Sequence, residues 1–162
     1  YSVGKGRACG GSNFQPDSVA DRILRTEVVP AVNQVETHPF CQQAEEAGIM
    51  ARYGVQAEAW APFAEGRNNL FGNEVLTDLA AKHRKSVAQV VLRWLIQRGI
   101  VVIPKSVHKE RMAENIDVFD FTLPPEDMAR IAALDMKQSC FLSHRDPQTV
   151  EWLGTMKYDL DK

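Results

Sequence analysis

The chain has 162 residues, of which 44% are apolar and 25% are charged, and its formal net charge at pH 7 is −2. This composition is that of a globular domain with enough length to bury a core. The nearly balanced charge gives no reason to expect a nucleic acid or an anionic membrane as partner, and no apolar run reaches the ~20 residues of a membrane span.

Three cysteines, Cys9, Cys41 and Cys140, lie far apart in the sequence and form no C-x-x-C pair. Zinc and dithiol motifs use such close pairs, so the sequence predicts no metal site. Reduced thiols are typical of cytoplasmic proteins, and a cytoplasmic location is therefore the simplest interpretation.

The first predicted elements are a short strand within residues 4–14 and a helix over residues 16–25. The glycines of the first segment do not match a dinucleotide-binding fingerprint, because Cys9 stands where that motif needs glycine. Ser12 and Asn13 follow the strand as polar residues. From their residue types alone, both could cap the next helix, which is a common role for Ser and Asn.

A second strand is predicted over residues 31–36, and strand alternation places Gln34 and Glu36 on one face. Polar residues in that position are either ligand contacts in the interior of a barrel or a satisfied polar pair in the core. His38 precedes Pro39 at the end of this strand, and a structural role is the favoured interpretation for it.

A helix over residues 42–52 and a third strand over residues 54–62 come next, with Trp60 near the end of that strand. An aromatic side chain there is either part of the core or a flat surface for a ligand ring. Residues 64–69 form a polar loop, and residues 73–83 a helix. Ser86 and Gln89 match a capping box, which predicts a helix that ends at Gly99.

A fourth strand over residues 100–103 is followed by Lys105 and Ser106 and then by a predicted helix that carries Arg111. Ser106 is the expected N-cap of this helix. A helix start flanked by two cations is suited to binding a phosphate, although a solvated helix start would use the same residue types. A last helix begins at Pro124–Pro125, and residues 137–162 are predicted to be a loop-like tail.

Strand and helix alternate four times, which predicts a parallel α/β sheet of the TIM (β/α)8-barrel type. A complete barrel of eight strands typically needs about 250 residues. We therefore expect this chain to carry about four βα units, a partial barrel, and to be part of a larger protein.

The sequence Ile-Pro-Lys-Ser, four residues, Arg111, two residues, Glu114-Asn115 and then Val118 resembles the C-terminal motif of the aldo/keto reductase family. The pattern Gly-Lys-x-Arg-x-x-Gly-x-Ser-Asn-Phe over residues 4–14 resembles a second motif of that family. The resemblance extends over residues 4–154 and covers the C-terminal half of the family barrel, nearest to bacterial members of the 2,5-diketo-gluconate reductase type.

The resemblance implies that the cofactor is NADPH. Lys105, Ser106 and Arg111 would bind its 2′-phosphate, and Glu114 and Asn115 would contact the adenine end. At the other end, the nicotinamide carboxamide would be bound by Ser12, Asn13 and Gln34, and the nicotinamide ring would stack on Trp60.

The resemblance also places the C-terminal tail beside the substrate pocket, so His144 and Trp152 are candidate pocket residues, with a surface position as the equal alternative. The four catalytic residues of the family, an Asp, a Tyr, a Lys and a His, precede Gly4 in the family pattern, and we expect no catalytic residue in this chain.

The expected function is that of an NADPH-dependent oxidoreductase that reduces small aldehydes and ketones to alcohols, with this chain supplying the cofactor-binding half. The alternative is a truncated, catalytically inactive half-barrel that binds nucleotide or associates with itself. The partner would accordingly be a missing N-terminal half or a second copy.

Overall fold

The structure is a computed structural model that describes residues 4–143 and 145–157. Its elements in chain order are β1 (Gly10–Ser12), α1 (Pro16–Arg25), β2 (Val32–Glu36), α2 (Ala44–Arg52), β3 (Gln56–Trp60), the 3₁₀ segment η1 (Ala64–Gly72), α3 (Glu74–His83), α4 (Val87–Gln97), β4 (Val101–Val102), α5 (Lys109–Ile116), α6 (Pro125–Ala132) and α7 (Pro147–Thr155). In this part of the chain, no helix is both long and apolar enough to cross a bilayer.

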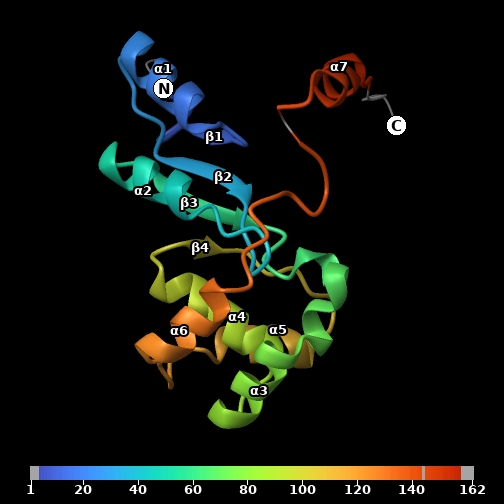
Figure 1. Cartoon of the computed structure of the whole chain (residues 1–162). Helices are drawn as coiled ribbons and strands as arrows, with labels where there is room; N and C mark the ends of the chain where they lie inside the picture. The colour runs from blue at the N-terminus through green and yellow to red at the C-terminus, as the bar shows by residue number, and fades with distance from the viewer. Residues whose placement is uncertain (1–3, 144, 158–162) are drawn as a thin grey trace.

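The strands form one parallel sheet in the order β1-β2-β3-β4 (Figure 1). Each strand pairs with the next one along the chain, and the order never reverses as it does in a doubly wound sheet. This is the winding of a β/α barrel. The prediction of barrel-type α/β units is therefore confirmed, with four strands among the described residues.

The two faces of the sheet differ in burial. Val35, Ala57 and Ala59 are buried and join the apolar core, together with residues from the helices such as Met50. Gln34 pairs with Glu58 in the strand register, so both lie on the opposite and less buried face. In a closed β/α barrel the helices cover the outer face of the sheet, so the less buried face corresponds to the interior of the barrel.

Helix α4 is the most deeply buried helix of the described chain, and its start was predicted correctly. The Ser86 hydroxyl accepts from the backbone N–H of Gln89, while the Gln89 side chain accepts from the backbone N–H of Ser86, which completes the capping box. Trp94, which lies in the buried apolar stripe of this helix, is 1% exposed. The burial of this stripe fixes α4 against the sheet and against α3.

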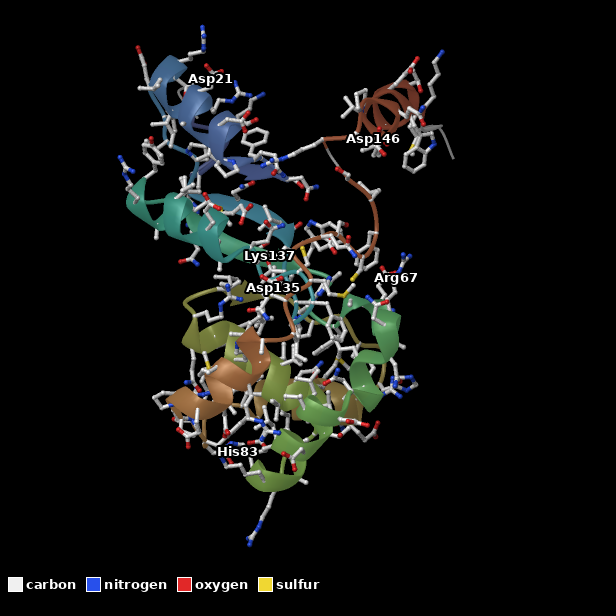
Figure 2. All side chains as sticks on the ribbon, viewed as in Figure 1. Asp21, Arg67, His83, Asp135, Lys137 and Asp146 are labelled. Carbon is white, nitrogen blue, oxygen red and sulfur yellow. The ribbon has the colours of Figure 1, made fainter. Side chains whose placement is uncertain are left out.

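Helix α6 is tied to α3 by a buried carboxylate. Asp127 is 1% exposed and accepts from Lys82 Nζ at 2.7 and 2.9 Å and from His83 Nε2 at 2.6 Å. Burial raises the pKa of Asp127, but the hydrogen bonds from Lys82 and His83 outweigh it and hold this pKa below its usual value. Figure 2 shows His83 at the end of the molecule opposite to Asp146.

Helix α2 begins two residues later than predicted, because Gln42 is used in tertiary contacts. Its backbone N–H donates to Asp135 Oδ1 at 3.1 Å, and its side-chain Nε2 donates to the carbonyls of Pro39 and Ile131, both at 2.8 Å. The following residue, Gln43, has a left-handed backbone with φ of 50°. These contacts exclude Gln42 from a regular helix.

The tail was predicted to be loop-like, and this prediction was wrong for part of it. Helix α7 forms within the tail and stands apart from the sheet (Figure 1). The Asp146 carboxylate caps this helix, because it accepts hydrogen bonds from the backbone N–H groups of Gln148 and Thr149. Pro147 occupies the first position of the helix. A capping Asp followed by Pro is a standard helix start, and this local signal in the sequence was overlooked.

Candidate cofactor site

The carboxyl ends of three strands meet at Asn13, directly after β1. Its backbone N–H donates to the Gln34 carbonyl on β2 at 2.9 Å, and its Oδ1 accepts from Trp60 Nε1 on β3 at 2.7 Å. Ser12 is the register partner of Gln34. The structure therefore brings together four residues that the sequence analysis had placed on three separate strands.

Neither Ser12 nor Asn13 caps α1, which was the alternative role considered for them. The N-cap residue of α1 is Gln15, and no side chain caps this helix. Asn13 instead has a left-handed backbone with φ of 57°, a conformation that Asn tolerates better than most residues. Its side chain is thereby turned toward Trp60.

The polar groups at these strand ends are engaged with one another in the structure. Gln34 Nε2 donates to Glu58 Oε1 at 2.6 Å, and Asn13 Nδ2 donates to Ser12 Oγ at 3.3 Å. Trp60 also contacts Phe141 edge to face, with ring centroids 5.2 Å apart. A ligand in this region would exchange such contacts for its own.

A second group of predicted residues lines one cavity of about 520 Å³ beside α5. Five of its lining residues are those expected to bind the phosphate and adenine end, namely Lys105, Ser106, Arg111, Glu114 and Asn115. The start of α4 and two aromatic residues, Phe63 and Phe71, complete the wall. Lys105 and Arg111 are exposed and form no ion pair within the described part of the chain.

Ser106 was expected to cap α5, and this expectation was wrong. The helix begins at Lys109 with His108 as its N-cap residue and without a side-chain cap. The Ser106 hydroxyl instead accepts from the backbone N–H of His108 at 3.1 Å, which closes a small turn before the helix. The turn displaces the helix start, so Arg111 lies in the first turn of α5.

Phe63 and Phe71 were not recognised in the sequence. Phe71 is 49% exposed, and the centroid of its ring lies 5.8 Å from the centroid of the Phe63 ring. The signal in the sequence that could have indicated them is that two aromatic residues flank an otherwise polar loop. Their rings add an apolar surface to a cavity that otherwise carries charged and polar groups.

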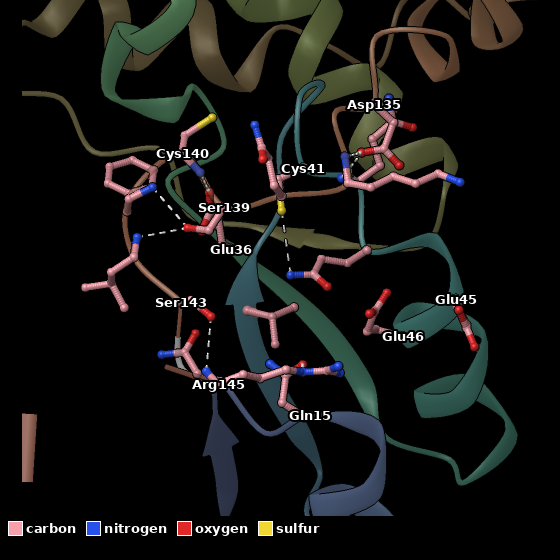
Figure 3. Close-up of a pocket in the computed structure, with 18 of the residues that line it drawn as sticks. Gln15, Glu36, Cys41, Glu45, Glu46, Asp135, Ser139, Cys140, Ser143 and Arg145 are labelled. Atoms are coloured by element: carbon pink, nitrogen blue, oxygen red, sulfur yellow. Dashed lines mark hydrogen bonds between the residues drawn. The ribbon is translucent and has the colours of Figure 1, made fainter. Parts of the chain in front are cut away.

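The segment over residues 135–142 crosses the strand ends, where Glu36 binds it (Figure 3). Glu36 is 4% exposed and accepts from Ser139 Oγ at 2.5 Å, from the backbone N–H of Cys140 at 2.8 Å and from His38 Nε2 at 2.9 Å. Burial raises the pKa of Glu36, but these hydrogen bonds outweigh it and hold the pKa below its usual value.

Among the described residues, Glu36, His38 and Cys140 have side chains near enough to share a metal ion, with ligand atoms within 4.8 Å of one another. Their hydrogen bonds argue for a different role. Because His38 Nδ1 accepts from the backbone N–H of Phe40 at 3.3 Å, the ring proton must be on Nε2, which faces Glu36. The arrangement is that of a satisfied hydrogen-bond network, in agreement with the structural role expected for His38.

A larger cavity of about 750 Å³ lies between the segment over residues 135–143 and the start of α2. Asn13 and Glu36 are part of its wall, as are Cys41 and Arg145. Burial, reinforced by the nearby Glu36 carboxylate, raises the pKa of Cys41 to about 12, which keeps this thiol protonated and unreactive at neutral pH. All three cysteines are free.

Of the two candidate substrate-pocket residues, Trp152 does not line this cavity. His144 lies outside the described residues. Trp152 lies on α7, where its side chain is 56% exposed. A role for either residue in substrate binding stays a prediction.

The family model of the aldo/keto reductases matches residues 1–136. The chain belongs to the aldo/keto reductase family. Among curated relatives, it is 50% identical over 135 residues to a glyoxal reductase of Bacillus subtilis, which covers 83% of this chain and 48% of that protein. It is 43% identical over 129 residues to the methylglyoxal reductase DkgA of Escherichia coli, covering 80% of this chain and 47% of the relative.

Solved aldo/keto reductase structures agree with this assignment. An enzyme from a deep-sea metagenome library superposes with a TM-score of 0.86 at 39% identity, over 90% of this chain and 54% of its own. A Bombyx mori enzyme solved with NADP gives a TM-score of 0.79 at 34% identity, over 85% of this chain and 47% of its own. The chain thus spans about half the length of the aldo/keto reductase relatives it matches.

Proposed function

We propose that this chain is the NADPH-binding part of an aldo/keto reductase that reduces small aldehydes and ketones. The observation that carries the proposal is that Lys105, Ser106, Arg111, Glu114 and Asn115 line a single cavity. These residues come from a loop and from the helix after it, and their side chains need not have converged. Their convergence supports one continuous site for the adenosine phosphate end of the cofactor.

Lys105 and Arg111 are the groups suited to the 2′-phosphate. Both are cationic and exposed, and neither is neutralised by a carboxylate in the described part of the chain. A phosphate that receives hydrogen bonds from two cations gains charge-assisted contacts that a ribose hydroxyl does not provide. The pair therefore favours NADPH over NADH.

At the adenine end, Glu114 and Asn115 offer a carboxylate and an amide to the edge of the base. The half-exposed ring of Phe71 on the same cavity offers a flat apolar surface to its face. Together these groups suit a purine, which combines a polar edge with two apolar faces.

Ser12, Asn13, Gln34 and Trp60, at the carboxyl ends of the strands, would hold the nicotinamide end. The bound cofactor would supply the hydride for reduction of the substrate carbonyl. Because Oδ1 of Asn13 is held by the Trp60 indole and one N–H of Nδ2 is donated to Ser12, the second N–H of Nδ2 is the group that can donate to a carboxamide oxygen. The side chains of this chain bind and orient the ring. Two relatives are named for the reduction of glyoxal and methylglyoxal, which supports a small carbonyl compound as substrate.

Carbonyl reduction also needs an acid that protonates the developing alkoxide. The single tyrosine of the described residues, Tyr53, caps the C-terminal end of α2 and precedes β3, at the opposite end of the strand from Trp60. We therefore propose that the proton donor is supplied by a part of the protein that precedes Gly4, and that the 162-residue chain by itself is inactive.

Binding of two adenosine phosphates to the purified chain tests the proposal without a complete nicotinamide pocket. We expect adenosine 2′,5′-bisphosphate to bind at least tenfold more tightly than adenosine 5′-monophosphate, about the effect of one charge-assisted hydrogen bond. Equal affinities would refute the phosphate site. The coding DNA upstream of residue 1 would show whether the Asp, Tyr, Lys and His of the family are present in frame.

The second candidate function is a half-barrel that associates with itself. Val101 on the edge strand β4 is 40% exposed, and Ile103 beyond it is 53% exposed, which is an apolar edge capable of pairing. Sedimentation of the purified chain separates the two candidates, because a monomer that binds the bisphosphate favours the cofactor function and a dimer that does not bind it favours association.

A further inference from the structure

Helix α4 carries three polar side chains at a spacing of four residues, Gln89, Arg93 and Gln97, which lie on one face of the helix. All three reach the chain that follows Ala113. Arg93 Nη1 donates to the Val118 carbonyl at 3.4 Å, and Gln97 Nε2 donates to the Leu123 carbonyl at 3.0 Å. Their side chains donate to backbone carbonyl groups at the end of α5 and in the segment after it, where these carbonyls are not paired with a strand.

Gln89 is the member of this row that contacts α5 itself. Its side-chain Nε2 donates to the Asp117 carbonyl at 2.7 Å and lies 3.3 Å from the Glu114 carbonyl, both at the C-terminal end of α5. Its Oε1 accepts from the backbone N–H of Ser86 at 3.0 Å. One buried amide, 6% exposed, thus joins the start of α4 to the end of α5.

Helix α5 has few other attachments. It contains no buried residue, and no side chain caps its N-terminus. Lys85 adds a second link near the same end through Asp117 Oδ2 at 3.1 Å. A short helix held at one end depends strongly on those contacts for its position, and α5 carries Arg111 and Glu114 of the cavity wall.

We propose that Gln89 is a positioning residue for the cofactor site: it holds α5 so that Arg111 faces the phosphate. Gln89 does not line the cavity, although its neighbours Ser86, Val87 and Ala88 do, so it acts from behind the wall. This inference rests on the proposed NADPH-binding function. It adds to it the residue that sets the geometry of the phosphate end.

Gln89→Glu is the decisive substitution, because Glu at this position also completes a capping box and preserves the start of α4. The second carboxylate oxygen replaces the donor and faces the carbonyls of Glu114 and Asp117, so the link to α5 is lost. Gln97→Glu is the matched control. It makes the same change in the same helix, at a contact to Leu123 that lies beyond α5.

Two measurements on the wild-type chain and both variants test the proposal. Hydrogen exchange of amides in α5 is expected to be faster in Gln89→Glu and unchanged in Gln97→Glu. The ratio of NADH to NADPH dissociation constants is expected to fall about tenfold in Gln89→Glu only, as the phosphate contact is lost while the rest of the cofactor still binds.

The outcomes separate this inference from the function on which it rests. A wild-type chain without preference for NADPH overturns the proposed function, and the inference with it. A wild-type preference that Gln89→Glu leaves unchanged, or that Gln97→Glu lowers equally, overturns the positioning role alone. Unchanged exchange of α5 in Gln89→Glu also overturns it, since the link would then not hold the helix.

Discussion

The indole N–H of Trp60 donates to the side-chain oxygen of Asn13 across 2.7 Å, from the end of β3 to the end of β1. The strand between them contributes the Gln34 carbonyl, which accepts from the backbone N–H of Asn13. Trp60 therefore has two roles in the proposed site. Its ring is a surface for the nicotinamide, and its N–H sets which atom of the Asn13 amide faces the ligand.

Trp60→Phe and Trp60→Ala are expected to separate these roles. Phe keeps an aromatic face and loses the hydrogen bond, which should weaken NADPH binding by about 0.5–1.5 kcal/mol. Ala loses the face as well, for a further ~0.5–1.5 kcal/mol. Isothermal titration measures both losses, and quenching of tryptophan fluorescence by NADPH should shrink in both variants. Unchanged quenching would mean that Trp94 or Trp152 is the responsive residue.

Lys105→Ala and Arg111→Ala are each expected to weaken NADPH binding by about 1–3 kcal/mol, the scale of a hydrogen bond to a charged group, with little change for NADH. Lys109→Ala is the control, because Lys109 is exposed on the same helix and does not line the cavity. Titrations with both cofactors give the ratio. Equal losses for NADPH and NADH would show that the two cations do not bind the 2′-phosphate.

Asp127→Asn is expected to destabilise the chain by about 1–3 kcal/mol, because it removes the charge that the buried contacts to Lys82 and His83 need. Urea denaturation at pH 7 measures the loss of unfolding free energy. Glu126→Gln is the control, since Glu126 is exposed and its carboxylate lies 3.9 Å from Lys82 Nζ.

The same ion pair predicts a pH dependence. In the folded state, the hydrogen bonds from Lys82 and His83 hold the pKa of Asp127 below its ordinary value of 3.8. Its stabilisation is therefore fully present above the unfolded pKa and is lost as the pH falls through the folded pKa. The free energy of unfolding of the wild-type chain, measured by urea denaturation, should fall as the pH drops below about 4, and more steeply than that of Asp127→Asn. Parallel curves for the two proteins would contradict this assignment.

Glu36→Gln is expected to loosen the segment over residues 139–142, because the hydrogen bonds from Ser139 and Cys140 lose their charged acceptor. In a Cys9→Ser background, reaction of Cys140 with a disulfide reagent should then accelerate severalfold, because the segment opens and because the Glu36 charge, which adds to burial in raising the pKa of Cys140, is lost. Cys41 should stay slow, because burial is the main cause of its raised pKa and is unchanged. Glu45→Gln on α2 is the control. An unchanged rate would mean that other contacts hold the segment.

The 162-residue chain with NADPH and methylglyoxal should show no turnover, since Tyr53, the one tyrosine among the described residues, lies at the opposite end of β3 from Trp60. The absorbance of reduced nicotinamide follows the reaction. A rate within the usual enzyme range of about 1–10³ per second would refute the proposal that the acid lies outside this chain. Loss of such a rate in Tyr158→Phe would identify an acid in the tail.

Local patterns in the sequence determined most of the elements. The capping box of Ser86 and Gln89, the apolar stripe that includes Trp94 and the strand ending at Trp60 each depend on neighbouring residues alone, so they could be predicted without the fold. The motif from Lys105 to Asn115 also indicated one anion site, because its residues are close in sequence. Asp146–Pro147 was a local signal of the same kind that was overlooked.

The tertiary structure decided which residues meet across the sheet and between helices. Trp60 and Asn13 are 47 residues apart in sequence, and Ser139 and Glu36 are 103 apart, so no periodicity relates them. The sequence indicated that Gln89 belongs to a capping box. Only the folded chain shows that the amide nitrogen of the same side chain donates to the Asp117 carbonyl at the end of α5. Such contacts depend on strand order and helix packing, which come from burying apolar surface over the whole chain rather than from any one segment.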